Sequence, residues 1–149
     1  MHHRLLVHIV WTTRDRAPIL DLPRARFLAE NLPVIVRQER GRVLAVGIVA
    51  THVHLIIRLH PTTSLPRLLQ RLKGGTAHRI NTDTDCPGPT LRWAKGYSVT
   101  SVSPDNLGRA LTYVRCQHRR HPDQAIPGWP PRRPESSLSL ETDAETPSL

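Results

Sequence analysis

The stretch of sequence that decides the fold is Val46-Gly47-Ile48-Val49-Ala50-Thr51-His52-Val53-His54-Leu55-Ile56-Ile57. Its β-branched and aliphatic side chains pack well on a pleated sheet, so it predicts strand structure. Because side chains alternate along a strand, His52 and His54 share one face, while Val53, Leu55 and Ile57 share the other. The pattern leaves open whether residues 42–60 form one long strand or a hairpin that bends near Thr51.

His52 and His54 are candidate metal ligands. Their Cα atoms are expected about 6.7 Å apart, since a strand rises roughly 3.3 Å per residue. Two imidazole nitrogens at that spacing can converge on one divalent ion. The alternative is a pair of half-buried sheet histidines held by ordinary hydrogen bonds.

The charge of the chain is divided between a basic body and an acidic end. Residues 1–121 hold 19 Lys and Arg against 7 Asp and Glu, and residues 122–149 hold 2 against 5. A basic body suggests a polyanionic partner, usually nucleic acid, although arginine-rich genomes also produce such proteins. Cys86 and Cys116 form no zinc-binding spacing and are expected as reduced thiols of a cytoplasmic protein. No apolar stretch approaches the ~20 residues of a membrane span.

The remaining elements predict an α+β fold. A strand is expected at Leu5–Thr12, and another in Tyr97–Val102. Helices are expected at residues 23–40, where Pro33 predicts a kink or early break, at residues 65–72, and after Ser103-Pro104. The order β-α-β-β-α-β-α predicts a ferredoxin-like (RRM-like) antiparallel sheet with helices on one face and a tyrosine on the last helix. Residues 1–121 form the domain, and the Pro-rich, acidic residues 122–149 are expected as a disordered tail.

Tyr113 and Gln117 lie one turn apart on the polar, basic side of the last predicted helix. Taken alone, each is most simply a solvated surface residue. Together with His52 and His54, however, they form a recognisable combination of motifs.

His52-Val53-His54 followed by Tyr113-Val114-Arg115-Cys116-Gln117 resembles the single-tyrosine HUH transposases, both the IS200-like insertion-sequence enzymes and the REP-associated ones. Further segments match in the same order. They are Val10-Trp11-Thr12-Thr13-Arg14, Leu72-Lys73-Gly74 and Gly96-Tyr97-Ser98-Val99-Thr100-Ser101-Val102. The resemblance covers residues 5–121.

The resemblance implies metal-dependent cleavage and rejoining of single-stranded DNA during DNA transposition. Tyr113 would be the nucleophile and form a 5′-phosphotyrosine, and His52, His54 and Gln117 would hold Mg²⁺ or Mn²⁺. Such a set is chemically reasonable, because a phenol with a pKa near 10 needs activation and a divalent ion stabilises charge on a phosphate. No nucleotide cofactor is expected, because the tyrosine ester retains the energy of the broken bond.

The resemblance also implies a hairpin-containing DNA partner and a homodimer, in some members with the tyrosine helix serving the partner's histidines. Basic residues that fit DNA contacts, or simply solvated charge, are Arg14, Arg16, Arg67, Arg71, Lys73, Arg109 and Arg120, with Arg115 and Arg119 beside them. His8 and His118 are more simply structural than part of the site.

Two other classes of function compete with this interpretation. One is a non-catalytic nucleic-acid-binding module, including a domesticated transposase that has lost movement. An RRM-like module would need exposed aromatic residues on its sheet, and this chain has six Phe, Trp and Tyr in all. The other is a two-histidine phosphoesterase, which would not need Tyr113.

Overall fold

The stretch around the two histidines folds as a hairpin in the computed structural model, which describes residues 5–131. Strands β2 (Arg42–Val49) and β3 (His52–Leu59) pair antiparallel across a turn at residues 50–51. β3 also pairs with β1 (Leu5–Thr12), and β1 pairs with β4 (Ser98–Ser101). The sheet order is β2-β3-β1-β4 and every pairing is antiparallel. The predicted α+β class with an antiparallel sheet is confirmed.

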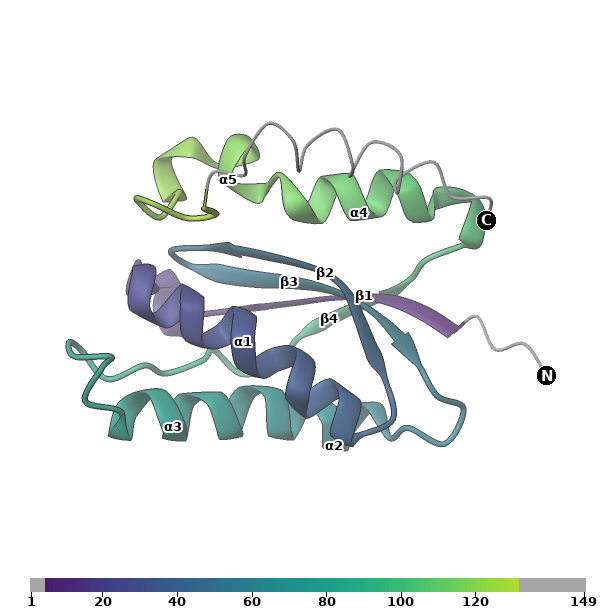
Figure 1. Ribbon diagram of the computed structural model, residues 1–149, viewed down its shortest axis with the longest axis horizontal. Coiled ribbons are helices and arrows are strands. Elements are labelled where there is room, and N and C mark those ends of the chain that lie inside the picture. Colours follow the sequence, from purple (N-terminus) through teal and green to yellow (C-terminus); the bar gives the residue numbers. More distant parts are fainter. Residues whose placement is uncertain (1–4, 132–149) are drawn as a thin grey trace.

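One face of the sheet is covered by α1 (Leu22–Gln38), α2 (Leu65–Gln70) and α3 (Thr76–Thr82), the last two joined by a π-helical turn at Arg71–Gly75 (Figure 1). The Asp21 carboxylate caps α1 by accepting from the Arg24 amide at 3.1 Å, as expected for an N-cap. The helix continues through Pro33, so the expected early break does not occur. Packing of its apolar side, Leu28, Leu32, Ile35 and Val36, into the main core outweighs the lost hydrogen bond.

The other face is covered by α4 (Leu107–Arg115) and α5 (Gln117–Arg120), which lie across the sheet from α1 to α3 (Figure 1). A second core joins Leu107 and Val114 of α4 to Leu6, Ala45 and Ile56 of the sheet. The expectation of helices on one face is therefore wrong. Leu6 of β1, Ala45 of β2 and Ile56 of β3 supply the apolar surface on which this second helical layer packs. No helix among residues 5–131 has the length and hydropathy needed to cross a bilayer.

The segment after α5 packs against the domain as far as the structure describes it. Pro122–Gln124 form a 3₁₀ turn, and the Ala50 amide donates to the Gln124 carbonyl at 2.8 Å. Ile126 is 3 % exposed and belongs to the main core, with Trp129 packed against that core. The packed part of the chain thus extends past residue 121, through the apolar side chains of Ile126 and Trp129. Residues 132–149 of the predicted tail lie outside the described residues.

Candidate active site

His52 and His54 lie on the sheet face that α4 and α5 cover. Val53, Leu55 and Ile57 are fully buried in the core on the other face, as the alternation predicts. The two imidazole rings are 5.0 Å apart between centroids, with their planes inclined at 67°. The predicted pair therefore converges on one place.

The surroundings of both rings favour neutral imidazole. Burial, followed by the charges of His52, His8 and His121, lowers the pKa of His54 to about 3. Burial is also the main cause of the lowered pKa of His52, although the nearby Gln117 side chain acts in the opposite direction. A neutral imidazole carries a lone pair, which is the form that binds a metal ion.

The Nδ1 atom of each ring has a side-chain neighbour at hydrogen-bond distance. His8 Nε2 lies 2.8 Å from His54 Nδ1, and the Thr51 hydroxyl lies 2.9 Å from His52 Nδ1. His8 reaches His54 from β1, whose Val10 pairs directly with His54 across the ladder. With Nδ1 occupied on both rings, Nε2 is the nitrogen left for a ligand.

Tyr113 lies on α4 against this imidazole group. Its ring meets His54 edge-on at 5.7 Å between centroids and His8 at 5.9 Å. The Arg120 guanidinium lies 4.4 Å above the tyrosine ring. One chain thus brings its own tyrosine and its own histidine pair together.

Gln117 is buried and is not the solvated helix-surface residue that its sequence position alone suggests. Cys116 leaves helical geometry (φ −104°, ψ 23°), so the single helix expected to hold Tyr113 and Gln117 is interrupted between α4 and α5. Gln117 is 1 % exposed, and its Nε2 donates to the Tyr113 carbonyl at 2.9 Å. Its Oε1 is buried and accepts no hydrogen bond from residues 5–131. A buried acceptor without a hydrogen bond destabilises the folded protein unless a ligand interacts with it.

The donor set fits a divalent ion. Two neutral imidazoles and one unpaired amide oxygen would leave positions open for water and a phosphate oxygen. Within residues 5–131 no three His, Cys, Asp or Glu side chains form a metal cluster. A metal bound here would therefore depend on the Gln117 amide as its third protein ligand.

Gly47 allows the tyrosine helix to lie this close to the sheet. It pairs with His54 in the β2–β3 ladder. A β-carbon at this position would lie 2.0 Å from the Val114 carbonyl oxygen and 3.0 Å from Gln117 Cγ. Sequence reasoning missed this role, although a glycine inside a β-branched strand often marks a close backbone approach.

Comparison with known proteins decides the family. The family model described as "Transposase IS200 like" matches residues 1–117. The chain belongs to this family. Among its curated relatives is the ISDra2 transposase TnpA of Deinococcus radiodurans, 26% identical over 121 residues, which are 78% of this chain and 86% of that protein.

Two solved structures share the fold of this IS200-like transposase. A transposase from Deinococcus radiodurans R1 superposes with a TM-score of 0.60 at 22% identity, covering 85% of this chain and 95% of that one. A REP-associated tyrosine transposase, solved bound to a REP hairpin, superposes with a TM-score of 0.62 at 13% identity, covering 80% and 70%.

The basic residues predicted to contact DNA fall into separate places on the transposase. Arg16 and Arg120 lie at the histidine site, since the charge of Arg16 lowers the pKa of His52 and Arg120 covers Tyr113. Arg14 and Arg109 are exposed. Lys73 instead holds a loop, because its Nζ donates to the Ala94 and Gly96 carbonyls at 2.7 and 2.8 Å.

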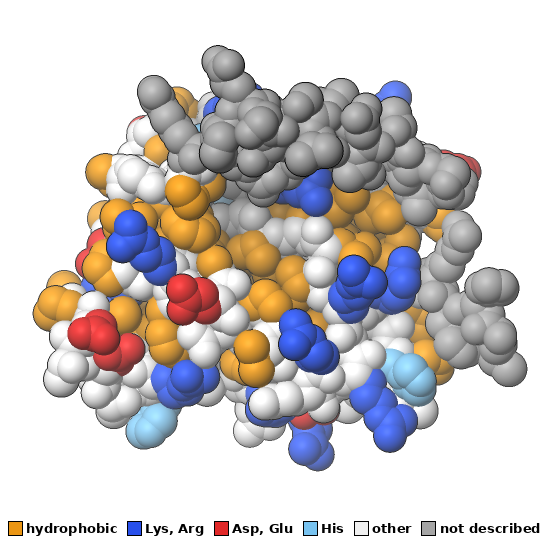
Figure 2. Space-filling model, viewed as in Figure 1, with side chains coloured by type: hydrophobic (Ala, Val, Ile, Leu, Met, Phe, Trp, Pro, Cys, Tyr) orange, Lys and Arg blue, Asp and Glu red, His pale blue; other side chains and the backbone are white. Residues whose placement is uncertain are grey.

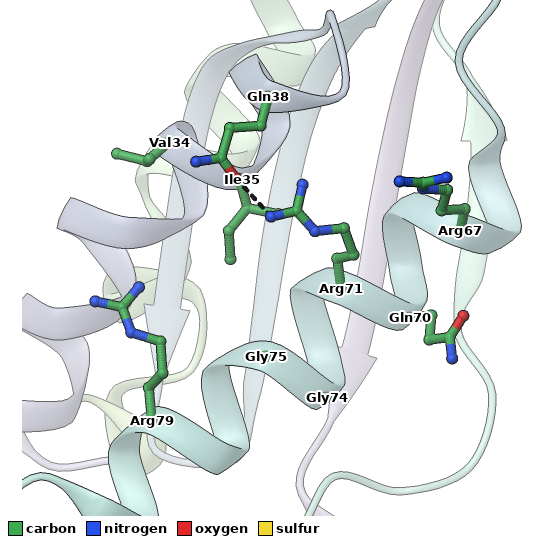
Figure 3. A pocket seen from close by; sticks show the side chains of 9 residues that line it. All are labelled: Val34, Ile35, Gln38, Arg67, Gln70, Arg71, Gly74, Gly75 and Arg79. Atoms are coloured by element: carbon green, nitrogen blue, oxygen red, sulfur yellow. Dashed lines mark hydrogen bonds between the residues drawn. The ribbon is translucent and has the colours of Figure 1, made fainter.

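Arg67 and Arg71 lie on the opposite side of the sheet from the histidines. Both contact the Glu39 carboxylate, at 3.1 and 3.2 Å. Together with Arg79 they line an open groove of about 780 Å³ between α1 and the α2–α3 helix (Figure 3). Lys and Arg side chains are spread over this part of the surface in Figure 2, and acidic ones are fewer. The groove therefore lies on the other face of the sheet from His52, His54 and Tyr113.

Two further histidines flank the site differently. The ring of His121 lies 5.3 Å from that of His52, a proximity that the sequence did not suggest. His118 bonds the backbone of Arg115 instead.

Proposed function

We propose that this transposase cleaves and rejoins single-stranded DNA through a covalent 5′-phosphotyrosine on Tyr113, with a divalent ion held by His52, His54 and Gln117. The observation that carries the proposal is the convergence of these four side chains. Tyr113 contacts His54, and the unpaired Gln117 Oε1 lies in the same buried region. Tyr97, the second tyrosine of the chain, is 43 % exposed on the surface, whereas the Tyr113 ring packs against His54 and His8.

In the proposed reaction Tyr113 is the nucleophile, and the divalent ion would assist at the phosphate. The Tyr113 hydroxyl attacks the phosphorus, forms the tyrosyl ester and releases the 3′-hydroxyl of the cleaved strand. Attack by a 3′-hydroxyl on that ester reverses the step and rejoins DNA. When bound, Mg²⁺ or Mn²⁺ would polarise the phosphate and stabilise the charge that develops on its oxygens.

Arg120 and Arg16 add positive charge beside this centre. The Arg120 guanidinium over the Tyr113 ring attracts the phosphate toward the nucleophile, and Arg16 places a second cation near His52. Electrostatic attraction of this kind supports positioning of a phosphodiester. A hairpin-containing single strand is the proposed partner, supported by the fold shared with a transposase solved bound to a REP hairpin.

The covered sheet weighs against an RRM-like binding module. Such modules stack bases on exposed aromatic side chains of an open sheet face. In this chain α1 to α3 cover one face and α4 and α5 the other (Figure 1).

The homodimer implied by the resemblance is proposed with each active site built within one chain. The packing of Val114 and Gln117 on Gly47 holds the tyrosine against its own histidine pair. Mixing Tyr113→Phe protein with His54→Ala protein should then restore no activity. Recovery in the mixture would show that the tyrosine serves the partner's site.

The deciding experiment is trapping of the covalent adduct. Labelled single-stranded hairpin oligonucleotides and unstructured controls are incubated with the protein and Mn²⁺, with and without EDTA, and analysed on denaturing gels. We expect an adduct with wild type and with Tyr97→Phe, and none with Tyr113→Phe or EDTA. Cleavage that persists in Tyr113→Phe without an adduct would instead establish a two-histidine phosphoesterase.

A further inference from the structure

The segment that follows the tyrosine helix reaches back to the histidine pair through two side chains. The Thr51 hydroxyl lies 2.8 Å from Gln124 Oε1 and 2.9 Å from His52 Nδ1. Gln124 is thus linked to the proposed metal ligand by a single hydroxyl group.

The direction of these two hydrogen bonds determines which nitrogen of His52 is protonated. An amide oxygen only accepts, so the single proton of the Thr51 hydroxyl is donated to Gln124 Oε1. Toward His52 the hydroxyl oxygen must then accept, which requires a proton on Nδ1. In a neutral imidazole the other nitrogen, Nε2, is left with its lone pair.

Gln124 and Thr51, which form a hydrogen-bond relay to His52, are both fixed by backbone hydrogen bonds. The backbone of Gln124 accepts from the Ala50 amide at 2.8 Å and donates to the His121 carbonyl at 2.9 Å. Thr51 is 7 % exposed, and its carbonyl accepts from the Thr13 amide at 2.8 Å. The hydroxyl is therefore held in place before any ligand arrives.

We propose that Gln124 and Thr51 are positioning residues that hold His52 as its Nδ1–H tautomer and so present Nε2 to the divalent ion. The inference rests on the proposed function for the identity of the ligand. An imidazole in the other tautomer would point an N–H at the ion and could not bind it. Removal of a partner that fixes a ligating histidine in this way typically lowers metal affinity by about 10–100-fold.

The experiment reads the tautomer directly in metal-free protein, by long-range ¹H–¹⁵N correlation of the His52 ring. Thr51→Val and Gln124→Met remove the relay, and Thr51→Ser and Gln124→Glu retain its hydroxyl and acceptor. Thr63→Val is the matched control, because the Thr63 hydroxyl donates to the Glu39 carbonyl at 2.9 Å, away from the site. Mn²⁺ affinity is measured by calorimetry on the same proteins.

We expect Nδ1–H at His52 in wild type, Thr51→Ser, Gln124→Glu and Thr63→Val, and loss of that preference in Thr51→Val and Gln124→Met. Mn²⁺ affinity should fall about 10–100-fold in the latter two. Nε2–H at His52 in wild type, or an unchanged tautomer in Thr51→Val, would overturn the proposal. If wild type shows the expected tautomer but binds no Mn²⁺, the relay stands and the proposed metal-dependent function fails.

Discussion

The carbonyl oxygen of Val114 occupies the space that a β-carbon on Gly47 would need, at 2.0 Å from its ideal position. Gly47 pairs with His54 in the sheet, and Val114 follows Tyr113 in α4. This single backbone contact therefore sets the distance between the nucleophile and a proposed metal ligand. A glycine is required because any side chain would push the end of α4 away.

Replacing Gly47 by alanine should displace the last turn of α4 and separate Tyr113 from His54. We expect destabilisation of about 1–3 kcal/mol, as for other overpacked sites, and a large loss of adduct formation. Urea unfolding and the denaturing-gel assay measure the two effects. Gly108→Ala is the control within α4, since nothing lies within 4 Å of its added β-carbon; alanine there should favour the helix. Full activity in Gly47→Ala would contradict this account of the contact.

Gln117→Met should separate stability from activity. The variant removes the buried Oε1, which has no donor among the described residues, and keeps a side chain of similar length. An unpaired buried acceptor costs about 1–3 kcal/mol, and the variant also loses the Nε2 hydrogen bond to the Tyr113 carbonyl, which is worth about 0.5–1.5 kcal/mol. The two effects offset each other, so metal-free Gln117→Met should be close to wild type in stability. Adduct formation should be lost, and Mn²⁺ should raise the melting temperature of wild type much more than that of the variant. Equal stabilisation of both proteins by Mn²⁺ would remove Gln117 from the ligand set.

His8→Phe should weaken metal binding without removing a ligand. His8 lies 2.8 Å from Nδ1 of His54, and loss of such a partner lowers metal affinity by about 10–100-fold. His8→Gln, which retains an acceptor, should lie between wild type and His8→Phe. Calorimetric titration with Mn²⁺ tests the order, and identical affinities in the three proteins would assign His8 a packing role only.

The buried histidines should make the metal-free domain sensitive to acid. Burial lowers the pKa of His54 to about 3 in the folded state, against about 6.5 in the unfolded chain. The unfolded state therefore binds more protons between these values, so the free energy of unfolding falls as the pH drops from about 6.5 toward 3.

His54→Asn removes that contribution. Between about pH 4 and 6 its stability should change less steeply than that of wild type, by about 1.4 kcal/mol per pH unit. Urea unfolding in EDTA at several pH values measures both slopes. Parallel slopes for the two proteins would show that His54 is not held neutral by the fold.

Local periodicity determined much of the site from the sequence alone. The two-residue repeat of a strand places His52 and His54 together and sends Val53 and Leu55 into the core. Leu107 and Val114 lie on the packed side of α4, as the helical repeat places residues at this spacing on one face. Such patterns are readable because each depends only on the geometry of one element.

Tertiary structure alone decided what surrounds those residues. The cross-strand register brought His8 to His54, and the return of the chain after α5 brought Gln124 to Thr51. Likewise Arg67 and Arg71 contact Glu39 of the α1 end, which no local pattern indicated. Contacts between distant segments depend on register and on the packing of helical layers, and those are set by the assembled core, not by the period of any single stretch.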